Sequence, residues 1–424
     1  MIAPDGISNS AGISQPDGIG RSGAIRAVVA ELLPTVVGLR RAIHRHPELA
    51  HLEYQTTELV AGTLRSNGLS PRTRTPLTGL TVEIGSGGPI VGFRADLDAL
   101  PIQEPEGLEF RSEVPSVMHA CGHDAHTAIG IGIALALARL EPLPGRVRVI
   151  FQPAEETFPG GGQEMVREGA ADGLDSVIAF HVDPTIVPGR VGLRSGPITA
   201  SADRFYITLE GPGGHTARPH RTVDLVYAAG KVITDLPALL DRLTDSRAPL
   251  VLVFGKVVGG TADNVIPSTV ELSGTCRTLD RSMWEDIPGL IEKLVQEIAA
   301  PTGAKVTFHF QRGIPPVINN ENVVAVCREA IAHNLGLEAV TVAPTSMGAE
   351  DFARFTEAVP GALLRLGARP GGRDVDLHSS AFQVDEAALE IGLLAGISSV
   401  LALLSARPDS LSREAGSRPP STRP

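Results

Sequence analysis

The spacing of apolar residues predicts that the chain begins with two helices. From 25 to 39, apolar side chains recur every three or four positions, which is the spacing of one helix face. The dipeptide His46-Pro47 interrupts this pattern. A second helix is expected from about 56 to 67, where Gly68 follows as a typical helix end.

The next apolar segments alternate between strand-like and helix-like lengths. Short apolar runs at 80–84, 90–95, 147–151 and 176–180 have the length of buried strands. A longer run of small and apolar residues at 128–138 predicts a buried helix. Strands that alternate with helices indicate an α/β fold, in which a largely parallel or mixed sheet is covered on both faces.

The pattern changes at about residue 202. The elements expected from there are strand, helix, two strands, helix and strand, at 203–210, 222–243, 250–258, 268–276, 284–299 and 305–311. This βαββαβ order is that of a ferredoxin-like module. We therefore expect an inserted domain at 202–316.

We expect the rest of the chain to complete the first domain, because helix-like and strand-like patterns resume at 321–335, 362–366 and 385–405. The length of 424 residues also suggests two domains. The predicted organisation is a flexible tail at 1–23, a discontinuous domain at 24–201 plus 317–405, the insertion at 202–316 and a disordered tail at 406–424.

Composition excludes some classes of partner. The formal net charge of −11 argues against nucleic acid, whose phosphates need a basic face. The apolar runs are shorter than the roughly 20 residues of a membrane span, and the N-terminus lacks the pattern of a secretory signal. Three cysteines far apart fit a reducing compartment better than a disulfide framework. We expect a cytoplasmic protein that binds neither nucleic acid nor membrane.

The densest set of metal-type ligands lies at 118–127, just before the buried helix. It contains one Cys, three His and one Asp, and burial of such groups is costly unless something uses them. A thiolate from Cys121 with an imidazole from His123 suits Zn²⁺, and also Mn²⁺, Co²⁺ or Ni²⁺ when carboxylates join. On its own the Cys-x-His pattern is weak evidence, because a buried Cys beside hydrogen-bonded histidines has the same sequence.

Further polar side chains follow the expected strands. Asp98, Glu155, Glu156 and His181 each come just after a strand, at the edge where open α/β sheets bind ligands. One of the paired glutamates can bind metal while the other acts as a general base toward water. Asp98 can orient a ligating imidazole. His378 lies in a polar loop, and a lone His such as this one is more often structural than ligating.

The insertion carries two further candidates. His215 lies in a Gly-rich loop at 211–219, which lacks the Walker pattern of phosphate-binding loops. A His on a flexible loop can instead polarise a carbonyl or stabilise an oxyanion. Arg277 ends an expected strand, and its guanidinium suits a substrate carboxylate, although a surface ion pair is the ordinary role of such an Arg.

Taken together, the motifs resemble those of the metal-dependent aminoacylase and carboxypeptidase family of dinuclear metallopeptidases. The similar branch contains hippurate hydrolases, N-acyl-amino-acid amidohydrolases and auxin-conjugate hydrolases. The resembling segments occur in the family's order over about residues 40–400, and include RAIHRHPEL at 41–49, FRADLDALPI at 93–102, MHACGHDAHT at 118–127, FQPAEE at 151–156, GGH at 213–215, NVIP at 264–267, GTCRT at 274–278, MGAEDF at 347–352 and LHS at 377–379.

The resemblance implies a fold and a set of roles. It implies a mixed-sheet catalytic domain with an inserted ferredoxin-like lid or dimerisation domain, and two divalent ions per subunit, with Mn²⁺ or Zn²⁺ favoured and Co²⁺ or Ni²⁺ possible. The implied metal ligands are Cys121, His123, Glu156, His181 and His378, with Cys121 as a bridge. Glu155 is implied as the general base and Asp98 as the carboxylate that supports it. The implied substrate-binding residues are His215, Asn264 and Arg277, of which His215 acts across a dimer interface in many relatives.

The implied reaction is hydrolysis of the amide bond of an N-acyl amino acid, in which Glu155 takes a proton from water and gives it to the leaving amine. A carboxypeptidase or dipeptidase that acts on small peptides is the first alternative, and the sequence hardly separates the two. A binding homologue without turnover would be expected to lack ligands or the base, all of which are present. A structural metal site is disfavoured, because such sites are typically closed by four Cys or His ligands.

Overall fold

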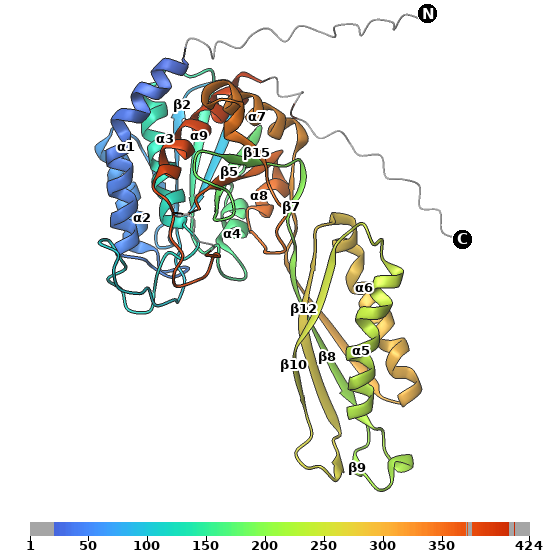
Figure 1. Ribbon diagram of the computed structural model, residues 1–424. Helices are drawn as coiled ribbons and strands as arrows, with labels where there is room; N and C mark the ends of the chain where they lie inside the picture. The colour runs from blue at the N-terminus through green and yellow to red at the C-terminus, as the bar shows by residue number, and fades with distance from the viewer. Residues whose placement is uncertain (1–20, 370, 372–374, 407–410, 412–424) are drawn as a thin grey trace, which may run out of the picture.

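The computed structural model describes residues 21–369, 371, 375–406 and 411. Its largest sheet has eight strands in the order β1-β2-β4-β3-β5-β16-β6-β15, of which β2, β5 and β15 are labelled in Figure 1. These strands are β1 (Arg72–Thr73), β2 (Leu80–Gly85), β3 (Ile90–Asp96), β4 (Arg146–Gln152), β5 (Ser176–Asp183), β6 (Val191–Leu193), β15 (Val340–Val342) and β16 (Gly361–Gly367).

The sheet is mixed, as the sequence predicts. Its centre is parallel, because β3 runs parallel to both β4 and β5, and β16 runs parallel to β5. Toward the edges, β2 is antiparallel to β4 and β6 is antiparallel to β16. The carboxyl ends of the four central strands therefore meet at one edge, where α/β sheets bind ligands.

Helices cover both faces of this sheet. One layer consists of α1 (Ser22–Arg45), α2 (Tyr54–Ser66), α3 (His123–Arg139), α7 (Glu321–Leu335) and α9 (Ala387–Ser405). The opposite face carries the short helices α4 (Gly161–Arg167) and α8 (Ala353–Ala358). The short 3-10 helix η3 (Leu337–Ala339) follows α7. Each face has its own apolar core, so the strands between them are buried on both sides.

Helix α3 lies at the centre of the first layer, where α1 and α9 pack against it. Gly396 of α9 permits this approach, since a Cβ at that position would lie 2.5 Å from the Ile133 side chain of α3. Among the described residues, helices α1 and α9 are long and apolar enough to cross a membrane, by length and composition only. In α9, 72% of the most apolar stretch is buried inside the protein, as in a core helix.

A second sheet is formed by the segment between β7 and β14. Its strands β8 (Ala202–Glu210), β10 (Leu250–Gly259), β12 (Thr269–Thr278) and β13 (Lys305–Ile314) are all antiparallel and have the order β10-β12-β8-β13. Helices α5 (Leu225–Leu243) and α6 (Arg281–Ala299) pack on one face and share a core with the sheet. Element order and strand order are those of a ferredoxin-like module. We call this part the inserted domain and the rest the main domain.

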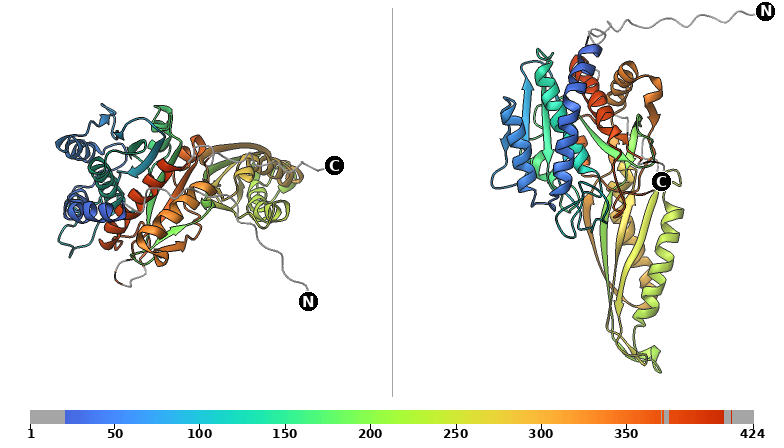
Figure 2. Two further views of the ribbon diagram at one scale, coloured as in Figure 1. Left: turned by 90° about the horizontal axis from the view of Figure 1, so that it is seen from above. Right: turned by 60° about the vertical axis from the view of Figure 1, so that its left-hand side comes forward.

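The inserted domain projects away from the main domain (Figure 2). Two strands, β7 (Gly196–Thr199) and β14 (Val317–Asn319), pair at the junction. At the far end, β9 (Gly214–His215) pairs with β11 (Val265–Ile266), close to the short helix η1 (Pro219–Arg221), and η2 (Ala300–Thr302) follows α6. The exact domain limits at 201/202 and 316/317 stay a prediction.

Several expected boundaries differ from the structure. Strand β5 runs to Asp183, so His181 lies within the strand and not after it. Helix α3 starts at His123, so this residue belongs to the first helical turn. Strand β13 runs to Ile314, three residues beyond the expected limit at 311. The tails expected at 1–23 and 406–424 fall mostly outside the described residues.

Candidate metal centre

The segment that carries Cys121 and His123 depends on the glycine between them. Gly122 has a φ of 82° and a Cβ there would lie 2.4 Å from the Val182 side chain, so a larger residue would be both strained and in collision. The tight turn ends one residue before α3 begins. It brings Cys121 and His123 to the sheet edge, beside the end of β5.

The hydrogen bonds of His123 leave one ring nitrogen free for a cation. Its Nδ1 lies 2.9 Å from the main-chain oxygen of Asp98, to which it can only donate. Nε2 is then the nitrogen with the lone pair, and it is buried without a hydrogen-bond partner among the described residues. The Oε1 atom of Glu156 is 3.9 Å from this Nε2. An orphaned acceptor nitrogen beside a carboxylate is the arrangement expected of a metal ligand.

His181 and His378 are oriented in a comparable way. His181 donates from Nδ1 to the carbonyl oxygen of Val182 at 2.7 Å, and its Nε2 lies 3.5 Å from the Cys121 sulfur. His378 has a φ of 60°, and its backbone N–H donates to Ala120 at 2.9 Å. The His378 Nε2 thereby lies 3.1 Å from Glu156 Oε1. A non-glycine residue in the left-handed region is a feature that clusters at functional sites.

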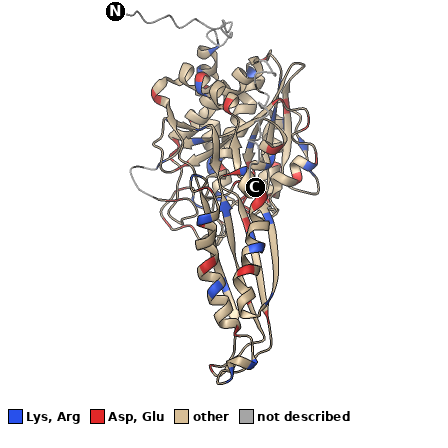
Figure 3. Ribbon diagram, turned by 90° about the vertical axis from the view of Figure 1, so that its right-hand side faces the viewer, with Lys and Arg blue, Asp and Glu red and all other residues tan. Residues whose placement is uncertain are grey.

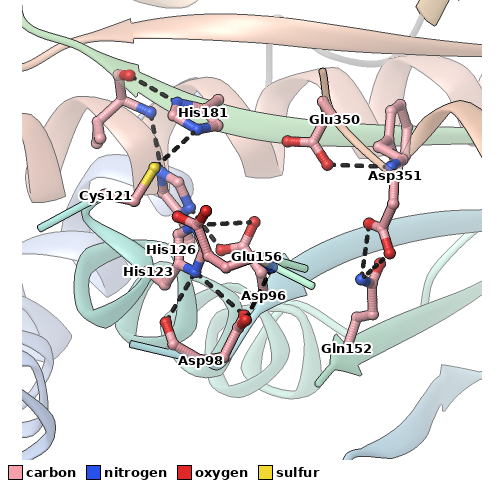
Figure 4. A network of polar contacts seen from close by, with 12 residues as sticks. Asp96, Asp98, Cys121, His123, His126, Gln152, Glu156, His181, Glu350 and Asp351 are labelled. Carbon is pink, nitrogen blue, oxygen red and sulfur yellow. Dashed lines mark hydrogen bonds and ion pairs between the residues drawn. The ribbon is translucent and has the colours of Figure 1, made fainter. Parts of the chain in front are cut away.

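The structure thus brings together all five residues that the resemblance implies as metal ligands, and Figure 4 labels Cys121, His123, Glu156 and His181 among them. Three overlapping groups have donor atoms within 4.8 Å of one another: Cys121 with His123 and His181, Cys121 with Glu156 and His378, and His123 with Glu155 and Glu156. Cys121 belongs to two of these groups. Thiolate, imidazole and carboxylate donors together suit borderline divalent ions, so the residues present fit a metal centre.

Glu155 lies beside this cluster and is buried. Its side chain is 8% exposed. Burial, followed by the charges of Glu350 and Glu156, raises the pKa of Glu155 well above its ordinary value. The residue before it, Ala154, has a φ of 53°, and its N–H donates to Glu53 at 2.7 Å. A buried carboxylate with a raised pKa is suited to take up a proton from water.

Asp98 links the two segments of the site. Its Oδ2 accepts a hydrogen bond of 2.9 Å from the backbone N–H of Glu156, and its Oδ1 lies 3.3 Å from Nδ1 of His123. Asp98 therefore holds the Glu155-Glu156 loop and the His123 ring in fixed relative positions.

The pKa values of two candidate ligands are raised, so that these groups hold protons at the place where a cation would bind. The Cys121 thiol and the Glu156 carboxylate beside it raise the pKa of His378 to about 10. Burial and the charge of Glu156 raise the pKa of the Cys121 thiol. Without a cation the anionic donors are neutralised by protons, which a divalent ion would displace.

His126 shows why not every histidine here is a ligand. Its Nε2 accepts from the Val182 N–H at 2.9 Å and its Nδ1 donates to Asp96 Oδ1 at 2.7 Å. Both ring nitrogens are used, so the nearby group Asp96, His123 and His126 is a hydrogen-bonded network. His119, the third histidine of the motif, is buried, and burial lowers the pKa of its ring to about 4.

Sequence reasoning missed a buried charged network next to Glu155. Arg94 lies in β3 and contacts Asp96 at 2.5 Å, Glu350 at 3.0 Å and Asp351 at 2.9 Å. Asp351 also accepts from the Gln152 amide at 2.8 Å (Figure 4). The available signal was a charged residue inside a buried strand, together with the MGAEDF segment, to which no role was assigned.

The three residues implied as substrate-binding do not lie together. His215 and Asn264 are neighbours, because β9 pairs with β11, and both are exposed at the end of the inserted domain farthest from the main domain (Figure 1). Arg277 is near the other end of β12, where its guanidinium donates to the Met347 carbonyl of the main domain at 3.0 Å. The five candidate ligands, Cys121, His123, Glu156, His181 and His378, are called the metal-type cluster below. Within one chain, His215 and Asn264 therefore do not reach this cluster.

Charge is mixed on the surface of the inserted domain. In Figure 3, basic and acidic positions are interspersed along its two helices. Such a face does not resemble the basic stripe that nucleic-acid binding requires.

Comparison with known proteins identifies the family. Residues 92–399 match the model of peptidase family M20/M25/M40. The chain belongs to this family. It is accordingly a hydrolytic enzyme that acts on amide bonds, and its fold is that of dinuclear metal-binding M20 peptidases.

Individual relatives carry several names. An N-acyl-L-amino acid amidohydrolase of Geobacillus stearothermophilus is 42% identical over 298 residues, which are 70% of this chain and 80% of that protein. Thermostable carboxypeptidase 2 of Saccharolobus solfataricus is 36% identical over 375 residues, 87% of this chain and 95% of that protein. A Rhodococcus jostii protein that bears the name glutamate–cysteine ligase 2-3 is 43% identical over 360 residues, and this chain spans only 45% of its length.

A solved structure supports the same assignment. The crystal structure of a Bacillus subtilis protein described as a dinuclear metal-binding peptidase of the M20 family has a TM-score of 0.79 and 33% identity, covering 89% of this chain and 99% of that one.

Proposed function

We propose that the protein hydrolyses the amide bond of N-acyl amino acids, with Glu155 as the general base beside two divalent ions. The observation that carries this proposal is that buried Glu155 belongs to one of three overlapping groups of donor atoms, together with His123 and Glu156. The proposed ligands are Cys121, His123, Glu156, His181 and His378. Mn²⁺ or Zn²⁺ is proposed as the metal, and Co²⁺ or Ni²⁺ also fits this mixed donor set.

The role of each residue follows from its contacts. A bound divalent ion would polarise the substrate carbonyl and make water more acidic. Glu155 accepts the proton of the attacking water and then delivers it to the leaving amine. Asp98 holds the Glu156 backbone and the His123 ring, and so fixes the position of the base Glu155 relative to these two ligands. The Arg94 cation near Glu350 and Asp351 offsets the negative charge that burial of these acids creates.

We further propose that the active unit is a homodimer. His215 and Asn264 lie at the far end of the inserted domain (Figure 1), so a second copy is needed to bring them to a site. Strand β10 is an edge strand and exposes Val253, Val257 and Val258. Unpaired edges with apolar side chains favour pairing with another strand. Arg277 would bind the substrate in the site of its own chain, and His215 and Asn264 would contact that substrate from the second copy once the dimer forms.

A carboxypeptidase or dipeptidase activity is the second candidate, supported by the similarity to a carboxypeptidase named above. Both reactions break an amide bond next to a carboxylate, so the catalytic groups would be shared. The cytoplasm stays our prediction for the location. All three cysteines are free and buried, as a reducing compartment allows.

The decisive experiment combines a substrate panel with two variants of the paired glutamates. The protein is loaded separately with Mn²⁺ and Zn²⁺ and assayed on N-acetyl amino acids, N-benzoyl amino acids and dipeptides. We expect N-acyl amino acids to be the best substrates. Glu155→Ala should lower turnover about a thousandfold, since general bases contribute about 10²–10⁴, and should keep its metal. Glu156→Ala should lose metal. The reverse pattern would exchange the two roles, and preference for dipeptides would favour the peptidase.

A further inference from the structure

Arg365 is a buried cation at the metal-type cluster whose role neither the ligand set nor the base explains. It lies in β16, where it pairs in parallel register with His181 of β5, and its exposed fraction is 6%. Side chains alternate along a strand. Leu364 and Leu366 belong to the core under α3 and α9, whereas Leu363 belongs to the opposite core. Arg365 therefore points to the same face as Leu363, and its partner His181 does too.

Arg365 differs from the other buried arginines in having no partner. Arg94 contacts three carboxylates, and Arg40 contacts Asp124 at 2.7 Å. Among the residues that the structure describes, no acceptor lies within hydrogen-bond or ion-pair distance of the Arg365 guanidinium. Its nitrogens are nevertheless not fully enclosed by protein atoms. The small exposed part of Arg365 thus includes its nitrogens.

The acidic groups around Arg365 make their contacts with other residues. Asp183 Oδ1 accepts from the N–H and the hydroxyl of Thr185 at 2.8 and 2.6 Å. Glu350 Oε1 accepts from the Phe352 N–H at 3.0 Å and pairs with Arg94, while Glu350 Oε2 is buried without a partner among the described residues. Burial lowers the pKa of Arg365, while Asp183, Glu350, Cys121 and Glu155 act in the opposite sense. These groups are thus near Arg365 but do not pair with it, so their charges alone leave its N–H donors unsatisfied.

A guanidinium that is buried and unpaired is costly unless a ligand completes it. Its planar set of N–H donors matches a carboxylate, which it binds through two parallel hydrogen bonds. Divalent ions next to His181 would repel the cation, so an anionic group between them is favoured by both charges. We propose that Arg365 binds a carboxylate of the substrate and makes the enzyme select for it. This inference rests on the proposed amide hydrolysis at the same site.

The carboxylate can belong to either half of the substrate. It is the α-carboxylate if Arg365 faces the amino acid, and a second carboxylate if Arg365 faces the acyl group, as in an N-succinyl amino acid. Two substrate pairs separate these sources: N-acetyl-methionine against its C-terminal amide, and N-succinyl-methionine against N-butyryl-methionine. Metal-loaded protein is assayed with Arg365→Met, with Arg365→Lys, and with Arg148→Met as control. Arg148 lies in the same sheet but pairs with Glu83 at its other end.

A hydrogen bond to a charged group contributes about 1.5–3 kcal/mol, so Arg365→Met should raise KM for the charged member of one pair about 10- to 100-fold. KM for its neutral partner should stay unchanged, Arg365→Lys should lie between, and Arg148→Met should behave as wild type. The pair that loses discrimination identifies the half of the substrate. Equal losses for both members of both pairs, with discrimination retained, would show a structural role and overturn the proposal.

A binding measurement separates this inference from the proposed function. Calorimetric titration of metal-loaded protein with succinate and with succinamide needs no turnover. We expect succinate to bind wild type and Arg148→Met more tightly than succinamide, and Arg365→Met and Arg365→Lys to lose most of that difference. If wild type hydrolyses none of the amides but this difference is lost, the proposed function fails and the carboxylate site stands. If all proteins bind succinate equally, the site fails whatever the substrate panel shows.

Discussion

The hydrogen bonds of each histidine decide whether it has a nitrogen left for a cation. His123 and His181 each donate a hydrogen bond from Nδ1 to a backbone carbonyl, which leaves Nε2 directed at the donor cluster. His126 spends both nitrogens, on Asp96 and on the Val182 N–H. His126 thus differs from His123 and His181 in having no ring nitrogen left for a cation, although the residue type is the same.

This difference predicts the outcome of two matched substitutions. His126→Gln should keep the full metal content and lower the free energy of unfolding by about 1–3 kcal/mol, because Asp96 and the Val182 N–H lose a buried partner. His123→Gln should lose metal. Metal analysis after dialysis and urea denaturation of both variants provide the test. Loss of metal from His126→Gln together with unchanged stability would make His126 a ligand.

A second prediction at this scale concerns the pH dependence of turnover. The negative charge of Glu350 raises the pKa of Glu155, and the base must be deprotonated to act. Glu350→Gln removes that charge, so the pKa of Glu155 falls and the acid limb of the kcat profile should move to lower pH. The exposed Glu338→Gln is the control and should leave the profile in place. A shift to higher pH would mean that Glu350 acts on Glu155 in another way.

The candidate ligands could be named from the sequence because their motifs resemble those of a known family, whereas residue type and position alone left His181 and His378 as more often structural, and the ligand set stays a prediction. Their support was not predictable. Arg94, Glu350 and Asp351 come from segments more than 250 residues apart, and their pairing is a property of the folded sheet. The same holds for Arg365, whose significance lies in the absence of a partner within reach in the described structure.

At the scale of elements, α1 is fixed to the start of α3 by buried charge. Arg40 and His44 of α1 both contact Asp124 Oδ2, at 2.7 and 2.9 Å. His44 Nε2 is also 3.1 Å from Glu104 Oε1. Asp124 follows His123 directly, so this network holds the helix end that carries a proposed ligand. Within the RAIHRHPEL segment, His44 thereby has a structural role.

The network predicts a pH-dependent contribution to stability. Burial opposes protonation of His44, but Asp124 and Glu104 outweigh it, and the net effect raises the pKa of His44. A raised folded-state pKa stabilises fully below the unfolded value of about 6.5, and this stabilisation is lost as pH rises through the folded-state pKa. His44→Gln should therefore cost about 3 kcal/mol at about pH 6 and less at about pH 9.

Urea denaturation of wild type and His44→Gln at both pH values measures this difference. The exposed His220→Gln lies outside this network and is the control, which should show only a small loss of stability. An equal loss for His44→Gln at both pH values would mean that His44 is neutral in the folded protein and acts through packing alone.

Long elements with a clear period were predictable, and short ones were not. The expected and observed limits of α7 coincide at 321 and 335. The strands β6, β7, β14 and β15 have three or four residues each, too few to show alternation, and are set by pairing with distant strands. In β5 the strand continues through His181 because its backbone pairs with that of Arg365 in β16. The polar side chain of His181 ends the apolar run from which the strand was predicted.

At the scale of the whole molecule, the inserted domain separates residues that the motifs suggest as one group. Strand β12 has ten residues, which at about 3.4 Å per residue spans about 34 Å. Arg277 is near the end at the main domain, and Asn264 lies just beyond the other end. Motif spacing gives the residues of a site but not the length of the strands that carry them. Whether His215 serves its own chain or another could therefore be decided only by a structure or an experiment.

The arrangement predicts that two inactive variants complement each other. Glu155→Ala removes the base from its own site, and His215→Ala removes a residue that we propose to act on the partner's site. In a mixed dimer, the chain with His215→Ala keeps its Glu155 and receives His215 from the Glu155→Ala chain, so one complete site forms. If random exchange makes half of the dimers mixed, each with one complete site of two, about a quarter of wild-type activity should return.

Both variants are purified, mixed under conditions of subunit exchange and assayed for amide hydrolysis. Each protein alone, and a mixture of Glu155→Ala with Glu156→Ala, should remain inactive, because in that second mixture each chain still lacks a group of its own site. Size-exclusion chromatography with light scattering establishes the dimer independently. If mixed dimers are shown to form but no activity returns, His215 acts on the site of its own chain. That outcome would require the inserted domain to move toward the cluster at Cys121.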